Sequence, residues 1–187
     1  MQGAATLSEL YAGILRELPS AQKFSEQDAH LLKAHQDQLL GWSSDLEQAV
    51  LESISEDQNP FAGPGALFTV GHWWAEAIKN GTSQDFWHRL TMMGLVNANR
   101  RLRMASVVGA WGIVEQKLLE KTHASFSGPE ATALAGALMR LVKTALALGS
   151  GSYLHGYLRA LSESTGTSYA LLERLAETEL SNVISSM

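Results

Sequence analysis

The sequence predicts an all-α protein. In each long segment of the 187-residue chain, apolar residues recur three or four positions apart, as they do along one face of a helix. Residues that begin and end helices flank these segments, and no segment alternates apolar and polar residues as a half-buried strand does. Hydrophobic residues make up 45% and charged residues 18% of the chain, a balance that suits one folded domain with a sizeable core.

The first predicted helix lies between Leu7 and Leu18, where apolar residues fall on one face and Pro19 prevents a continuation. A longer helical stretch begins after Ser25, which forms a capping pattern with Asp28 three residues later. The apolar residues that share a face of this stretch are Leu32, Leu39, Trp42, Leu46, Val50 and Ile54.

Gly41 predicts a bend or a boundary within that stretch, because glycine weakens a helix. The glycine- and proline-rich residues 57–65 predict a loop. The next helix is predicted from Ala66 to Asn80, with Gly81 at its end. Its expected inner stripe consists of Leu67, Gly71, Trp74 and Ile78.

The stretch from Phe86 to Trp111 is the centre of the prediction. Thr82 is expected to cap its helix, with Asp85 as the third helical residue. An arginine-rich break is expected from Asn97 to Arg103, and a further helix from Met104 to about Lys121.

The sequence Gly128-Pro129-Glu130 predicts another helix start, because proline suits the first turn and an acid faces the positive helix end. This helix continues to about Leu161 before Gly166 ends it. Its run Gly149–Ser152 is unusual, since each glycine inside a helix costs about 1 kcal/mol. Either the helix bends there or another body approaches its backbone closely. A last amphipathic helix is predicted from Ser168 to about Ile184.

Several classes of protein are disfavoured by what the sequence lacks. There is no cysteine, so disulfides and thiolate metal sites are excluded, and the net charge of −5 argues against nucleic-acid binding. No segment reads as a secretory signal or as a membrane span, and a cytoplasmic location fits. No phosphate-binding glycine loop, HExxH motif or nucleophile elbow is present, and the six histidines do not cluster. We therefore expect a non-enzyme without a metal site, a nucleic-acid partner or a membrane partner.

Asn97 is the first candidate site residue. It continues the helical stripe of Phe86, Leu90 and Met93, so its carboxamide is expected to face the interior, where it needs a hydrogen-bond partner. Two interpretations remain open: asparagine closing the helix in a left-handed conformation, or asparagine lining an internal pocket.

The other candidate site residues each have a structural as well as a functional interpretation. His72 either pairs with Glu76 on an exposed face or reaches over an interior pocket as a ligand. The tryptophans either fill the core or form the walls of a pocket for a flat ligand. The arginines at the break either hold an anionic group or form a solvated corner; they are Arg100, Arg101 and Arg103.

On these residues, the stretch from Phe86 to Trp111 resembles the helix F, corner and helix G segment of the globin domain in globin-coupled sensors and protoglobins. Asn97 then stands where that family has its proximal haem histidine, and Ala98–Met104 replaces the corner. Trp74 with Asn80-Gly81 resembles the end of helix E, and Lys143–Tyr157 resembles helix H. The resemblance implies a globin-like domain at residues 25–162, between an N-terminal helix and linker at 1–24 and a C-terminal connector helix at 163–187.

The resemblance implies a non-enzymatic sensor domain. A carboxamide is a poor iron ligand, so the haem-free globin domains of stress-signalling proteins are the nearer model. The implied pocket lining is Asn97, Trp74, His72, Met93 and Trp111. The implied partners are a second copy, a small-molecule ligand and a downstream signalling protein. The dimer would form through Met104–Lys121 and Pro129–Leu161, with Gly149–Ser152 allowing close approach. The alternatives are a haem-based gas sensor with a non-standard iron ligand, and a helical module that binds lipid or another small molecule.

Overall fold

The computed structural model describes residues 6–186, and within that range all regular structure is helical, as the sequence predicts. The α-helices are α1 (Leu7–Glu17), α2 (Glu26–Ala34), α3 (Gln36–Leu40), α4 (Ser43–Ser53), α5 (Val70–Asn80), α6 (Gln84–Asn99), α7 (Met104–Ser125), α8 (Gly128–Thr165) and α9 (Tyr169–Ser185). Two short 3-10 helices are η1 (Ser20–Gln22) and η2 (Glu56–Gln58).

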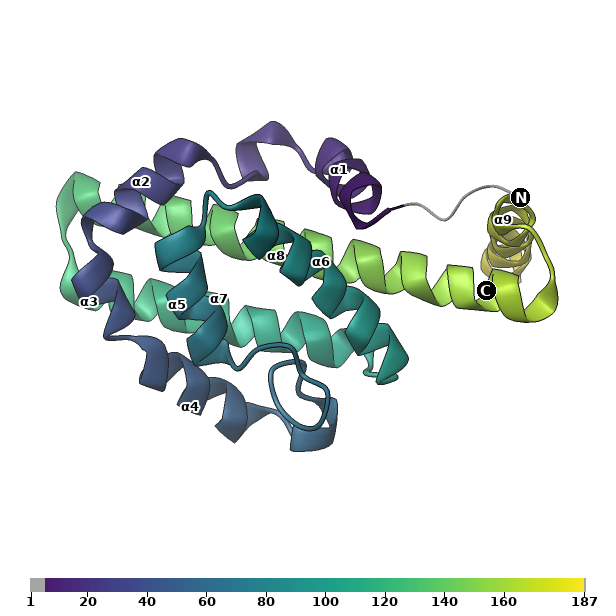
Figure 1. Cartoon of the computed structure of the whole chain (residues 1–187), viewed down its shortest axis with the longest axis horizontal. Coiled ribbons are helices and arrows are strands. Elements are labelled where there is room, and N and C mark those ends of the chain that lie inside the picture. The colour runs from purple at the N-terminus through teal and green to yellow at the C-terminus, as the bar shows by residue number, and fades with distance from the viewer. Residues whose placement is uncertain (1–5, 187) are drawn as a thin grey trace.

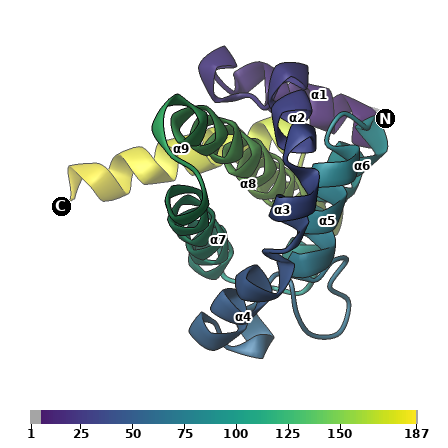
Figure 2. The same ribbon diagram turned by 90° about the vertical axis from the view of Figure 1, so that its left-hand side faces the viewer.

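The helices are arranged around the antiparallel pair α7 and α8 (Figure 1). α6 makes its main contact with α8, whereas α4 packs on α7 and on α5. α1 lies across α6 and α8. Figure 2 shows that α4, α5 and α6 lie to one side of the α7–α8 pair, and that α9 extends past the other side. Among residues 6–186, no helix therefore packs along the long face of α7 and α8 that is turned away from α4, α5 and α6.

The core consists of the predicted helical stripes and is rich in indole rings. Trp73, Trp74, Trp111 and Phe86 are all fully buried. The prediction that Leu67 belongs to the inner stripe of α5 is wrong, because α5 begins only at Val70 and the Leu67 side chain is 40% exposed. The Thr69 hydroxyl accepts from the amide of His72 and so sets the start of α5.

Helix boundaries in the first half differ from the prediction in three places. The stretch after Ser25 breaks at His35 as well as at Gly41, so that α2, α3 and α4 replace one or two helices. The predicted loop begins within η2 and extends to Thr69. The residue before α6 is Ser83 rather than Thr82, and its side chain makes no capping bond. The predicted cap of α2 is confirmed, because the Ser25 hydroxyl accepts from the amide of Asp28.

The small residues of α8 serve contacts within the chain. Gly94 of α6 lies so close to α8 that a β-carbon there would come within 3.0 Å of the Ser152 hydroxyl and the Gly149 carbonyl oxygen. Gly151 faces Ile14 of α1 in the same way. The predicted close approach is therefore confirmed, but the approaching bodies are α6 and α1. The dimer prediction loses the support that Gly149–Ser152 were expected to give it.

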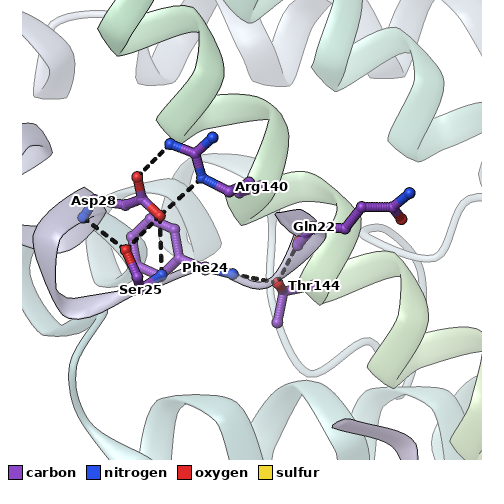
Figure 3. A network of polar contacts seen from close by, with 6 residues as sticks. All are labelled: Gln22, Phe24, Ser25, Asp28, Arg140 and Thr144. Atoms are coloured by element: carbon purple, nitrogen blue, oxygen red, sulfur yellow. Dashed lines mark hydrogen bonds and ion pairs between the residues drawn. The ribbon is translucent and has the colours of Figure 1, made fainter. Parts of the chain in front are cut away.

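A polar network fixes the N-terminal helices to α8 (Figure 3). Arg140 donates from Nε to Oδ2 of Asp28 at 3.0 Å and from Nη2 to Oδ1 at 2.6 Å. The Thr144 hydroxyl accepts from the Phe24 amide at 2.8 Å. Burial raises the pKa of the Asp28 carboxyl, but the bonds from Arg140 and Ser25 outweigh burial, so this pKa lies below its ordinary value. The capping pattern predicted from sequence is thus one part of a larger contact.

The length and composition of α8 would allow it to cross a membrane, contrary to the expectation that no segment qualifies. Its most apolar window has a mean hydropathy of 1.4, and half of that window is buried inside the fold. The core contacts with α6 and α7 account for much of this apolar character.

Candidate functional site

The predicted stripe of α6 forms as expected and carries Asn97 into the interior. Phe86, Leu90 and Met93 are 0% exposed, and Asn97 is 1% exposed. Gly94, on the neighbouring face, lets α6 lie directly on α8. Asn97 continues the buried stripe by one more helical turn, so its carboxamide is buried although the residues beside it are partly exposed.

The interpretation of Asn97 as a left-handed helix cap is wrong. α6 continues through Asn99, so Asn97 lies in its last turn, and the left-handed residue is Arg101 with φ of 58°. The amide of Leu102 donates to the Asn97 carbonyl at 3.1 Å, which closes the helix after the arginine turn. A helix end therefore does not explain the asparagine side chain.

The Asn97 carboxamide is buried without hydrogen bonds. Neither its Oδ1 nor its Nδ2 has a partner among residues 6–186. Leaving a buried polar group unsatisfied costs about 1–3 kcal/mol, so native proteins almost always supply a protein group, an ordered water or a ligand. The carboxamide offers both a donor and an acceptor, and can therefore bind a molecule that carries both.

A second group of buried polar atoms lies between α5, α7 and the loop before α5. The ring centres of Trp73 and Trp111 are 4.8 Å apart, and Phe61 packs against Trp111 with ring centres 5.0 Å apart. The indole N–H groups of Trp73 and Trp111 find no acceptor within the described chain, and neither does the side-chain amide of Asn59. By contrast, the Trp74 indole donates to the Leu39 carbonyl at 2.6 Å.

Arg100 connects these two regions. It follows Asn97 by one helical turn, and its Nη2 donates to the carbonyls of Ala62 at 2.6 Å and of Asn59 at 3.3 Å. Burial lowers the pKa of the Arg100 guanidinium, and its Nη1 has no partner in residues 6–186. Gly63, with φ of 79°, allows the loop to pass beside the guanidinium. Arg100 therefore holds the loop over the tryptophans. The sequence led us to expect either binding of an anionic group or a solvated corner, and Arg100 does neither. Arg101 and Arg103 are exposed.

His72 lies apart from the other predicted site residues. Its side chain is 58% exposed and pairs with Glu76, with Nε2 and Oε1 3.8 Å apart. It also packs edge-on against Phe68. The exposed-pair interpretation is confirmed, and the structure places His72 outside the interior that contains Asn97, Met93, Trp74 and Trp111.

In the described part of the chain, the charged side chains elsewhere do not form a metal site or an anion site. Within residues 6–186 there is no group of three or more His, Asp or Glu side chains that could hold a metal ion. A surface depression of about 590 Å³ lies beside Arg100 and is bordered by Glu56, Asp57 and the glycine loop. Its acidic rim opposes the arginine, so the depression does not favour anions.

Comparison of the chain with protein-family models, with curated proteins and with solved structures finds no match.

Proposed function

We propose that the chain is a non-enzymatic signalling domain of globin-like type, haem-free and dimeric. In this proposal the signal is received in the interior of the domain and passed on through a helical dimer interface. The observation that carries this proposal is the uncovered face of α7 and α8. Val108 on α7 is 44% exposed and Met139 on α8 is 39% exposed. A β-carbon at Gly109 or Gly112 would meet no neighbouring atom of residues 6–186 within 4 Å, so the described fold does not require glycine there.

Those two glycines favour a close helical partner. Each costs about 1 kcal/mol relative to alanine in a helix, and no contact within the described chain compensates. A second copy docked on this face would use the missing side chains for close approach. Dimerisation through α7 and α8 is also what the resemblance to sensor globins implies.

Haem is disfavoured by two features of the interior. The residue at the expected ligand position is Asn97, and carboxamide oxygen binds iron poorly. The space between α5 and α7 is filled by the indoles of Trp73 and Trp111, which are fully buried. We expect purified protein to show no Soret band after addition of haemin. A band that disappears in the His72→Ala variant would support the haem-sensor alternative instead.

The dimer is tested by light scattering across a micromolar concentration series. We expect Val108→Glu to weaken self-association at least tenfold, about 1.4 kcal/mol, because it places a charge in the contact. Leu51→Glu is the matched control, since Leu51 is 54% exposed on α4, away from this face. A monomeric parent, or equal effects of the two substitutions, would contradict the proposed interface.

A second candidate function follows from the unpaired interior atoms. Asn97, Trp73, Trp111 and Asn59 all present buried polar atoms without partners in residues 6–186. A small polar molecule with several hydrogen-bond acceptors and one donor, the donor for Asn97 Oδ1, would satisfy them, so the domain would act as a small-molecule-binding module. Native mass spectrometry of freshly purified protein tests this function, and protein of unliganded mass with an unchanged melting temperature across candidate ligands would count against it.

A further inference from the structure

Helix α9 forms without burying any of its residues. It has 17 residues, none of them buried. Isolated helices of about this length are marginal in water, because protein helices depend on packing of an apolar face. The exposed apolar side chains of α9 are Leu171 at 45%, Leu175 at 50%, Leu180 at 60%, Val183 at 53% and Ile184 at 71%.

The end of α8 has an exposed apolar stripe as well. Leu154 is 57% exposed, Tyr157 is 58% exposed and Leu161 is 39% exposed. Their spacing of three and four residues places them on one face of the helix. This face also includes Met139, fifteen positions before Leu154, so the stripe continues the uncovered face of the α7–α8 pair.

α9 points toward the space that a second copy would occupy. It lies crosswise to α8 at the far end of that helix and reaches beyond α7 and α8 on their uncovered side (Figures 1 and 2). The connection is short and well held: Ser162 donates from Oγ to the Thr167 carbonyl at 2.6 Å, and Tyr169 lies against His155 with ring centres 5.6 Å apart. The direction of α9 is thus set by the contacts at its first residues rather than by a surface that lies beneath the helix.

The apolar area is sufficient for a specific dimer. Leu175, Val183 and Leu180 lie toward one face of α9, whereas Leu171 and Ile184 lie at its two edges and are left out of the sum. These three, the three of the α8 stripe, and Val108 and Met139 of the uncovered face are each about half exposed. At roughly 150–200 Å² per free side chain they present on the order of 700 Å² per protomer, close to the roughly 800 Å² per partner of a standard interface. The charged residues of α9 are Glu173, Arg174, Glu177 and Glu179. Their net negative charge opposes adsorption to anionic lipid, which favours a protein partner over a membrane surface.

We propose that α9 is an exchanged arm: in the dimer, α9 of each protomer packs its apolar face on the stripe of Leu154, Tyr157 and Leu161 of the other protomer. The contact is isologous, so the same two surfaces are buried twice and the assembly closes at two copies. This inference rests on the proposed dimeric function and extends its interface to the end of the chain.

The absence of cysteine allows a direct test in the full chain. Two single-cysteine proteins are prepared, Ala160→Cys beside the α8 stripe and Ala176→Cys on α9, each with a different affinity tag. Both positions are exposed alanines, so the leucines and the tyrosine of the contact stay in place. The two proteins are mixed and treated with a short bismaleimide, and the mixed product is isolated through both tags. The control replaces Ala160→Cys by Lys79→Cys, which is exposed on α5.

We expect the mixed product from positions 160 and 176 in at least tenfold higher yield than from positions 79 and 176. Leu180→Glu should weaken the dimer at least tenfold while the helical circular dichroism of the protein stays the same. A dimer by light scattering with no excess of the mixed product would overturn the arm and leave the proposed function standing. A monomer at high micromolar concentration would overturn both.

Discussion

The contact of α6 with α8 can be tested by two glycine-to-alanine substitutions that should change stability in opposite directions. In Gly94→Ala the new methyl group would lie within 3.0 Å of Ser152 Oγ and of the Gly149 carbonyl oxygen. Nonbonded carbon contacts are optimal near about 3.5–4.0 Å, so α6 and α8 would have to separate. The carbonyl belongs to the backbone, and a side-chain rotation cannot relieve that part of the clash.

The size of the effect follows from two opposing terms. Overpacking of a well-packed contact costs typically about 1–3 kcal/mol, and a backbone clash belongs at the upper end. Alanine offsets about 1 kcal/mol of this through its better helix propensity. We expect Gly94→Ala to lower the free energy of unfolding by about 2 kcal/mol, which corresponds to roughly 4–8 °C in Tm for a chain of this size.

Gly149→Ala is the matched control from the same contact. A β-carbon at Gly149 would meet no neighbouring atom of the described residues within 4 Å, so only the gain in helix propensity remains. We expect this variant to be more stable than the parent by about 1 kcal/mol. Both variants are measured by thermal and urea unfolding at one protein concentration, because dimerisation makes Tm depend on concentration. If Gly94→Ala matched or exceeded the parent, the helices would not be as close as described.

Two further predictions concern buried polar groups. Asp28→Asn should lower the free energy of unfolding by about 1–3 kcal/mol at pH 7, because it breaks the paired contact with the partly exposed Arg140. Since folding lowers the pKa of the Asp28 carboxyl, the difference in stability between parent and variant is present above the unfolded pKa of about 3.9 and is lost as the pH falls through the folded pKa. Urea unfolding of both proteins from pH 7 to pH 2 measures this difference. A difference that stayed constant over that range would refute the prediction. Asn97→Leu should raise the free energy of unfolding by about 1–2 kcal/mol, because an apolar side chain of similar size replaces two polar atoms that have no partner in residues 6–186. A lower Tm for this variant would show that the carboxamide does have a partner, such as an internal water.

Local signals in the sequence predicted most of the helices. Ser25, Gly128 and Gly166 act on the backbone within a few residues of their own positions, so their roles can be read without the fold. Gly166 indeed adopts φ of 67° at the end of α8. The inward direction of Asn97 also follows from local periodicity alone. The break at His35 has no comparable signal, since the residue carries no strong preference to end a helix.

The contacts that define the site depend on residues far apart in the chain. Arg140 meets Asp28 across 112 positions, and Arg100 meets Ala62 across 38. Spacing cannot predict such pairs, because many exposed arginines have the same local surroundings. Gly94 did carry a signal, since a glycine beside the inner stripe of a helix costs about 1 kcal/mol unless another backbone lies against it. The exposure of His72 could not be decided in advance, because histidine suits either face of an amphipathic helix.

Two of the features that find no partner within residues 6–186 are the carboxamide of Asn97 and the apolar side chains of α9. Domains of this size are stable by only about 5–15 kcal/mol, so such features persist mainly where function uses them. The structure joins them through one contact, because the helix that carries Asn97 lies on α8 at Gly94, and α8 continues directly to the root of α9. A molecule that bound Asn97 and shifted α6 would therefore move the helix that bears the proposed dimer arm. Gly94→Ala displaces the same contact without a ligand, so in the proposed sensor it should change self-association as well as stability.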